Sequence, residues 1–165
     1  MSDMDPTRID IKFNPQIQRM VGVAYHGNTP FDVPFMSELD ARLWQGGCQN
    51  GLILPKFIDV VVSLYPWEKY TIYHDAERIE VTMYDSIDQT FEQVDDIARM
   101  VNRYRDDGKN VLVHCQAGLN RSSLVAARAL MLDGKSADTA INLIREKRSE
   151  ACLCNPAFEA YLRNL

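Results

Sequence analysis

Short blocks of apolar and polar residues alternate along the chain, and the period of each block predicts its secondary structure. Runs rich in β-branched and aromatic residues predict strands at 42–47, 57–65, 78–85 and 111–115. Apolar residues at helical spacing predict four helices. The first helix begins at a cap, Ser86 or Asp88, and ends before Gly108. The other three span about 122–132, 137–147 and 155–165. Strands alternating with helices indicate an α/β domain with a largely parallel sheet.

The first 35 residues follow neither period. They hold four of the seven prolines, which favour turns over regular elements. We therefore expect residues 1–35 to form an N-terminal extension of ordered turns, and residues 36–165 to form the catalytic domain. The extension could cover a cleft, extend the sheet or mediate self-association.

Composition and charge exclude several classes of function. A net charge of −5 argues against a broad nucleic-acid surface. No apolar run is long enough to cross a membrane, and the acidic start does not resemble a signal peptide. The four cysteines match no common zinc pattern, so we expect reduced thiols and no metal. These features favour a cytoplasmic protein, and we expect a monomer.

The segment between the strand at 111–115 and the following helix carries the candidate chemistry. It reads Cys115-Gln116-Ala117-Gly118-Leu119-Asn120-Arg121. Backbone N–H groups at the start of a helix have no intrahelical partners and, with the helix dipole, can hold an anion. Gly118 would allow the backbone to turn, and Arg121 could bind two oxygens of an oxyanion. The same field would stabilise a thiolate at Cys115.

Each of these residues also has an ordinary structural interpretation. Cys115 could be a small buried core residue, and Asp85 and Asp88 could both be helix caps. The basic run at 145–148 is typical of a solvated helix face. The aromatic residues at 65–73 are expected to pack within loops, although one could line a substrate cleft. Cys48, Cys152 and Cys154 are expected to be inert, unless one forms a protective disulfide with oxidised Cys115.

The sequence HCQAGLNRSS at 114–123 resembles the His-Cys-x5-Arg-Ser/Thr signature of the protein tyrosine phosphatase superfamily. Its form is similar to that of the compact, atypical dual-specificity branch. The segments RLWQGG, FIDVVVSLYP and NPAF are similar to other elements of this branch, so that the resemblance covers about 38–165. It implies a single domain with a central, twisted, largely parallel sheet of about five strands flanked by helices.

The resemblance also implies roles for individual residues. Cys115 would be the nucleophile and Arg121 would bind the phosphate in the transition state. Asp85, one helix and one strand upstream, would be the general acid and base, with Asp88 as the second choice. Ser122 would assist departure of the thiolate, and His114 would support the loop without acting as a base. The phosphate-binding loop would consist of Gln116, Ala117, Gly118, Leu119 and Asn120, and no metal or other cofactor would be required.

The substrate class implied by the resemblance is a phosphoprotein carrying phosphotyrosine, phosphoserine or phosphothreonine. Relatives that act on phosphoinositides have lysines in the loop, which this chain lacks. Those that remove RNA 5′-phosphates often have Thr-Gly after the arginine, where this chain has Ser122 and Ser123. Such substrates stay open as alternatives, as does an inactive phosphate-binding module. A rhodanese-type sulfur carrier is disfavoured because it lacks the upstream acid. We expect neither nucleic acid nor membrane as a partner.

Overall fold

The structure is a computed structural model that describes residues 9–10, 21–26, 29–83 and 91–165. A five-stranded sheet in the order β4-β5-β8-β6-β7 lies at its centre. Strand β4 is antiparallel to β5, and the other neighbours are parallel. The strands are β4 (Met36–Asp40), β5 (Leu43–Gly46), β6 (Val60–Ser63), β7 (Glu77–Glu80) and β8 (Val111–His114). The prediction of a single α/β domain with about five largely parallel strands is confirmed.

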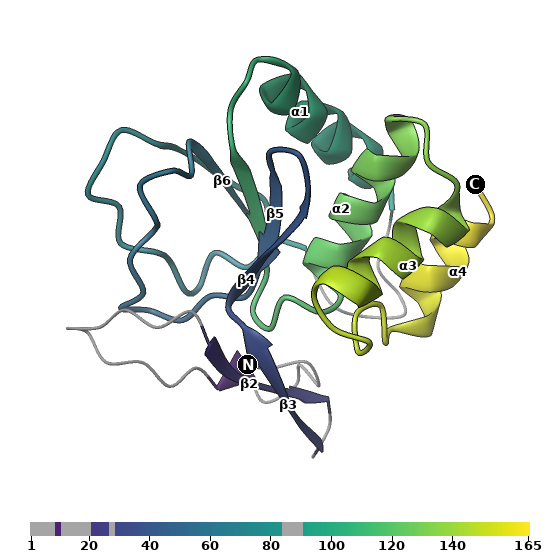
Figure 1. Cartoon of the computed structure of the whole chain (residues 1–165), viewed down its shortest axis with the longest axis horizontal. Helices are drawn as coiled ribbons and strands as arrows, with labels where there is room; N and C mark the ends of the chain where they lie inside the picture. Colours follow the sequence, from purple (N-terminus) through teal and green to yellow (C-terminus); the bar gives the residue numbers. More distant parts are fainter. Residues whose placement is uncertain (1–8, 11–20, 27–28, 84–90) are drawn as a thin grey trace.

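The helices cover one face of this sheet (Figure 1). Helix α2 is apolar around most of its circumference because it packs against the sheet and against α1, α3 and α4. The helices are α1 (Val94–Asp106), α2 (Arg121–Leu132), α3 (Ala137–Lys147) and α4 (Pro156–Arg163). Within the described ranges, no helix has both the length and the apolar character needed to cross a bilayer.

Strand β8 is the central strand, and all four of its residues are buried. Its neighbours share one register, since Leu43 and Val60 both pair with Val111. At the other end, Gly46 and Ser63 both pair with His114. The carboxyl ends of three parallel strands are therefore level, at the edge of the sheet where ligands bind in open α/β folds.

The helix boundaries follow their capping residues. Ser136 accepts a hydrogen bond from the N–H of Thr139 at 3.1 Å and opens α3, as predicted. Asn155 caps α4 in the same way, with Pro156 in the first turn. Helix α1, however, begins only at Val94, with Gln93 in the capping position. The sequence analysis placed the start too early, because Phe91 shares the apolar spacing without being helical. The proposed caps Ser86 and Asp88 themselves lie outside the described residues.

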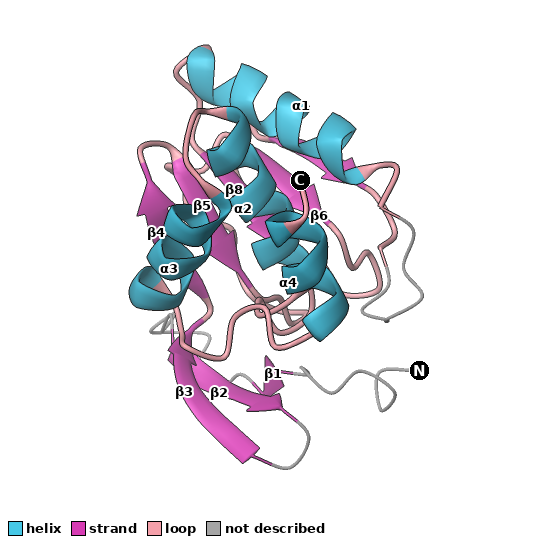
Figure 2. Ribbon diagram, turned by 90° about the vertical axis from the view of Figure 1, so that its right-hand side faces the viewer, coloured by secondary structure: helices cyan, strands magenta, loops and turns pink. Residues whose placement is uncertain are grey.

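The N-terminal segment contains strands that the sequence analysis did not predict. Strands β1 (Ile9–Asp10), β2 (Val21–His26) and β3 (Thr29–Pro34) form a separate antiparallel sheet in that order. It extends from one end of the domain (Figure 2). Pro30 and Pro34 are compatible with strand structure because β3 is an edge strand, where a missing N–H need not break the sheet. Only Phe35 separates β3 from β4.

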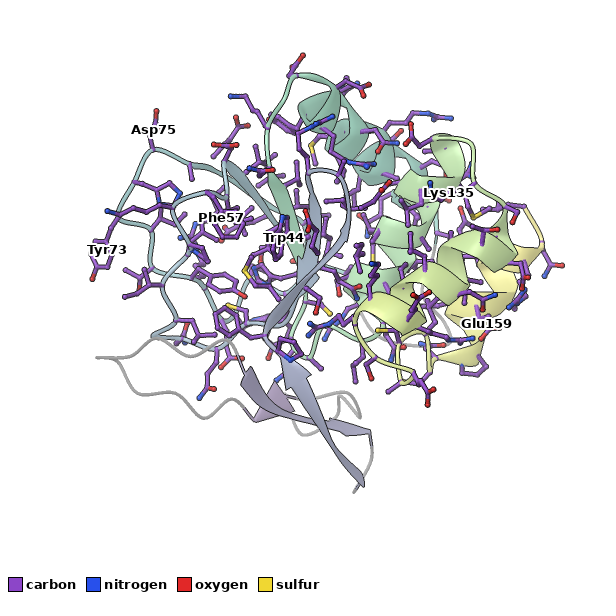
Figure 3. The ribbon with its side chains drawn as sticks, viewed as in Figure 1. Trp44, Phe57, Tyr73, Asp75, Lys135 and Glu159 are labelled. Carbon is purple, nitrogen blue, oxygen red and sulfur yellow. The ribbon has the colours of Figure 1, made fainter. Side chains whose placement is uncertain are left out.

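Loops cover the other face of the five-stranded sheet (Figure 1). The rings of Trp44 in β5 and Phe57 lie 5.0 Å apart on this side (Figure 3). Tyr73 is at the outer end of these loops and points away from the helices (Figure 3). The sheet is thus enclosed between a helical layer and a loop layer.

Candidate active site

The loop at residues 115–121, here called the Cys–Arg loop, joins the end of β8 to the start of α2. Every residue from His114 to Ala127 is buried. The N–H of Cys115 donates to the carbonyl of Gly46 at 3.2 Å, which continues the pairing of β8 with β5 by one residue. The loop therefore starts at the carboxyl end of the central, fully buried strand of the sheet.

Two groups contact the sulfur of Cys115. The N–H of Gly118 donates to Sγ at 3.3 Å, and Ser122 Oγ lies 3.3 Å from Sγ. A thiol would donate to this hydroxyl, whereas a thiolate would accept a hydrogen bond from it. Cys115 lies beside the first turn of α2, where the helix dipole favours negative charge.

Arg121 is the first residue of α2, and its side chain is only 3% exposed. Its Nη1 donates to the carbonyl of Met83 at 3.3 Å, and its guanidinium carbon lies 5.0 Å from the centre of the Tyr65 ring. Tyr65 in turn contacts Trp67, with ring centres 5.0 Å apart. Arg121 is thus held between the segment that follows β6 and the segment that follows β7.

Gln45 of β5 supports the loop from behind. Its Nε2 lies within hydrogen-bond distance of the carbonyl of Gly118 (3.1 Å), Ser122 Oγ (3.1 Å) and Ser123 Oγ (2.6 Å). Gly118 has φ +73°, and a Cβ there would lie 2.5 Å from the carbonyl carbon of Gly46. A glycine is therefore required at 118 both for the turn and for the close approach of β5.

Arg148 is a second buried arginine on this rear side. Its Nε donates to the carbonyl of Gly118 at 2.6 Å and its Nη2 to the carbonyl of Ala117 at 3.3 Å. The prediction of a solvated basic face at 145–148 is wrong for Arg148, which is only 7% exposed. It is correct for Glu146 and Lys147, which are exposed. The run is therefore divided: Arg148 is buried, Arg145 is partly exposed, and Glu146 and Lys147 face water.

The two ends of the loop are held by backbone contacts. The carbonyl of Gln116 accepts from the N–H of Cys48 at 3.0 Å. The carbonyl of Leu119 accepts from the N–H of Leu153 at 2.7 Å. The side-chain oxygen of Asn120 accepts from the N–H of Asn155 at 2.9 Å and from Cys154 Sγ at 3.3 Å. The segment before α4 therefore fixes the point where the loop becomes helix.

His114 lies under the loop. Its Nδ1 is 3.1 Å from the carbonyl oxygen of Cys115, so Nδ1 carries the proton, since a carbonyl only accepts. Its ring packs edge-on against that of Tyr70, whose hydroxyl donates to the carbonyl of Gly47. Burial lowers the pKa of His114 to about 4. A neutral imidazole bound to the backbone suits support of the loop.

Both candidates for the general acid, Asp85 and Asp88, lie outside the described residues. All four cysteines are described, and none forms a disulfide. Burial raises the pKa of the thiols of Cys48 and Cys152, which makes both weak nucleophiles. The structure thus brings together Cys115, Arg121, Ser122, His114 and the intervening loop.

Sequence reasoning missed three residues of this site. Gln45 carried a signal in the sequence, because it is a polar residue inside a predicted strand, directly before a glycine pair. Such polar residues are seldom buried without a specific role. Tyr65 was one of several loop aromatics, and nothing in the sequence linked it to Arg121. Arg148 carried no signal beyond its place in a basic run, because its partners are backbone carbonyls about 30 residues or more away in the sequence.

Comparison with protein families identifies the class. Residues 55–165 match the model of the dual specificity phosphatase catalytic domain, which is well over half of the chain. The chain therefore belongs to the dual specificity phosphatase family, as the resemblance at 114–123 implied.

Individual relatives are distant. Protein 123R of Invertebrate iridescent virus 6, named as a candidate tyrosine phosphatase, is 26% identical over 111 residues, which cover 66% of this chain and 76% of that protein. Mouse protein tyrosine phosphatase type IVA 3 is 46% identical over 48 residues, covering 29% of this chain and 28% of that protein. The structure of human DUSP28 superposes with a TM-score of 0.70 at 17% identity, covering 79% of this chain and 92% of that one. This last likeness shows the fold alone.

Proposed function

We propose that this chain is a cysteine-dependent protein phosphatase that hydrolyses phosphotyrosine and phosphoserine or phosphothreonine through a cysteinyl-phosphate intermediate. One observation carries the proposal: Cys115 Sγ is held between the N–H of Gly118 and the hydroxyl of Ser122, in a loop that ends in Arg121. This arrangement joins a nucleophile to donors for the oxygens of a phosphoryl group. We assign the activity to residues 36–165, with residues 1–35 as an extension.

In the first step the Cys115 thiolate attacks phosphorus, forming the S–P bond as the bond to the leaving oxygen breaks. Loop N–H groups and Arg121 bind the other oxygens of the phosphoryl group. Arg121 Nη1 would exchange the carbonyl of Met83 for one of these oxygens. Asp85 gives its proton to the leaving oxygen.

In the second step water attacks phosphorus and the S–P bond breaks, which releases inorganic phosphate and restores the thiolate. Asp85, now ionised, takes the proton from the attacking water. The Ser122 hydroxyl donates to the departing sulfur, for which its 3.3 Å distance from Sγ is suitable. None of these steps needs a metal.

A phosphoprotein substrate is supported by the side chains around Arg121. Tyr65 and Trp67 form an aromatic pair beside it, and Trp67 is 56% exposed. An exposed aromatic side chain that is linked to an anion-binding arginine through a second aromatic ring suits the ring of phosphotyrosine. The loop has no lysine for the additional phosphates of a phosphoinositide.

The experiment is hydrolysis of phenyl phosphate in the presence of EDTA by the wild type and by Cys115→Ser. We expect turnover by the wild type and none above background by the variant. Rapid quenching in acid, followed by mass spectrometry, should find a phosphoryl group on the peptide that contains Cys115. A wild type that binds phosphate or vanadate but turns nothing over would contradict the proposal and favour the inactive binding module.

The general acid is identified by comparing Asp85→Asn with Asp88→Asn on two leaving groups. Loss of the acid should lower kcat by about 100-fold or more on phenyl phosphate. It should lower kcat much less on p-nitrophenyl phosphate, because p-nitrophenolate leaves readily without a proton. We expect this pattern for Asp85→Asn alone. The same pattern in Asp88→Asn would exchange the two roles.

Competing substrate classes are compared on the same protein. Wild-type kcat/KM is measured with phosphotyrosyl and phosphoseryl peptides, an RNA with a 5′-phosphate, and a soluble phosphoinositide. We expect the peptides to be hydrolysed fastest. A higher kcat/KM on the RNA or the phosphoinositide would reassign the substrate and leave the cysteinyl-phosphate chemistry intact.

A further inference from the structure

Arg148 occupies an unusual position for a charged residue. It follows the last residue of α3, is nearly fully buried, and donates four hydrogen bonds to the protein. Two reach the Cys–Arg loop, at the carbonyls of Gly118 (2.6 Å) and Ala117 (3.3 Å). The other two, both from Nη1, reach the carbonyl of Pro34 (2.8 Å) and Ser37 Oγ (3.1 Å).

No carboxylate among the described residues lies within ion-pair distance of Arg148. The positive charge of Arg148 is therefore not neutralised by a carboxylate, and its partners are neutral oxygen atoms. A buried charge with neutral partners acts over a longer range than a paired one. Burial lowers the pKa of Arg148, whereas negative charge at Cys152 or Cys115 would raise it. Both of these sulfur atoms therefore lie within electrostatic range of the Arg148 charge.

The two loop bonds also determine where the loop N–H groups point. In a trans peptide, the carbonyl of one residue and the N–H of the next point in opposite directions. With the carbonyl of Ala117 turned towards Arg148, the N–H of Gly118 faces Cys115, where it donates to Sγ. The carbonyl of Gly118 is also turned towards Arg148, so by the same geometry the N–H of Leu119 points to the side of the loop that carries the Cys115 sulfur.

An arginine is suited to this task and a lysine is not. The guanidinium presents five donors in one plane, so that one side chain can bind three carbonyls and a hydroxyl at once. Two of these acceptors, on Pro34 and Ser37, precede residue 55, where the family match begins. The end of β3 and the start of β4 therefore share one side chain with the loop.

We propose that Arg148 is a positioning residue for this phosphatase site, which holds the carbonyls of Ala117 and Gly118 outward so that the loop N–H groups and the thiolate face the phosphate. This inference rests on the proposed function. It gives the rear of the loop a role in anion binding, in addition to that of Arg121 at the front.

The test compares Arg148→Met and Arg148→Lys with Arg145→Met in the full chain. Arg145 is a matched control one turn earlier in α3. It binds Glu159 and the carbonyls of Cys152 and Leu153 in the segment before α4, but donates no hydrogen bond to the loop itself. Three quantities are measured: kcat/KM on phenyl phosphate, competitive inhibition by inorganic phosphate, and the pH dependence of Cys115 alkylation by iodoacetamide. Circular dichroism and thermal unfolding establish that each variant folds.

We expect both Arg148 variants to lose about 10- to 100-fold in kcat/KM and in phosphate affinity, as for loss of hydrogen bonds to a charged group. The midpoint of alkylation should move to higher pH in Arg148→Met and stay near that of the wild type in Arg148→Lys, which keeps the charge. Arg145→Met should lose thermal stability while its kcat/KM stays within about twofold of the wild type, because a partly exposed ion pair away from the loop affects folding alone.

Folded Arg148 variants with wild-type phosphate inhibition and alkylation would overturn the proposal. If neither variant folds, Arg148 is a structural residue and the proposal fails as well. A wild type without turnover removes the proposed function instead. Phosphate binding and alkylation then still compare Arg148→Met with the wild type, so the two failures are distinguishable.

Discussion

The two sides of the Cys–Arg loop, the front that carries the Cys115 sulfur and the rear that faces Gln45 and Arg148, present different chemical groups. The front presents the sulfur of Cys115, the N–H of Gly118 and the guanidinium of Arg121, all within one continuous segment. The rear presents carbonyls, and these are bound by Gln45 and Arg148 from other parts of the chain. The front supplies the groups that would react with or bind the phosphate, and the contacts at the rear determine how these groups are oriented. Changes on the two sides should therefore differ in kind.

The largest effect is expected at the front, from Arg121→Lys. A lysine keeps the charge but cannot bind two oxygens in one plane, so we expect kcat on phenyl phosphate to fall about 100- to 1,000-fold. Thermal unfolding should change little, because the aliphatic part of the side chain remains. A loss no greater than that of Arg148→Lys would mean that the front arginine has no special role.

Next in size is a change of backbone at the rear, Gly118→Ala. The new Cβ would lie 2.5 Å from Arg148 Nη2 and from the carbonyl carbon of Gly46, at φ +73°. We expect a loss of about 3–4 kcal/mol in the free energy of unfolding, from the left-handed backbone and the overpacking together. Urea denaturation measures it.

Gly108→Ala is the control for this change. Gly108 has a similar φ of +81°, but no neighbouring atom lies within 4 Å of the position that a Cβ would take. It should cost only about 1–2 kcal/mol, the backbone contribution alone. Equal losses in the two variants would show that the close approach of β5 and Arg148 to Gly118 contributes nothing to the cost of the substitution.

A third prediction concerns pH and His114 below the loop. Burial lowers its pKa from 6.5 to about 4, so the unfolded chain binds a proton at pH values where the folded chain does not. Its contribution to stability is therefore complete above pH 6.5 and is lost progressively as the pH falls to about 4, by about 3 kcal/mol. Urea denaturation of the wild type and His114→Gln across this range measures it. Parallel curves for the two proteins would contradict this account.

The smallest effect is expected from Trp67→Ala, at the aromatic edge of the front. Loss of one ring contact should lower kcat/KM on a phosphotyrosyl peptide about threefold to tenfold, with little change on a phosphoseryl peptide. Tyr73→Ala is the control, since Tyr73 is 73% exposed and points away from the helices (Figure 3). Equal losses on both peptides would remove Trp67 from substrate selection.

The same division explains what could be predicted from the sequence. The apolar run of β8 and the contiguous residues from Cys115 to Ser122 carry their pattern within one short stretch, so the fold class and the front of the loop were accessible. Gln45 and Arg148 meet the loop across 73 and 30 positions, and no local pattern records such pairings. The strands at 21–34 were not predicted because prolines usually interrupt a sheet, although an edge strand tolerates them.

The long sequence separations behind the loop have a consequence for folding. The loop acquires its shape only after β5, the end of α3 and the segment before α4 have docked, because each contributes a bond to it. Contacts of this kind form late, once the entropy of closing long chain segments has been overcome. A partly folded chain should therefore lack the contacts of the Gly118 N–H and the Ser122 hydroxyl with the sulfur of Cys115. Catalytic activity and global structure should therefore disappear at the same urea concentration, so that activity itself reports cooperative unfolding.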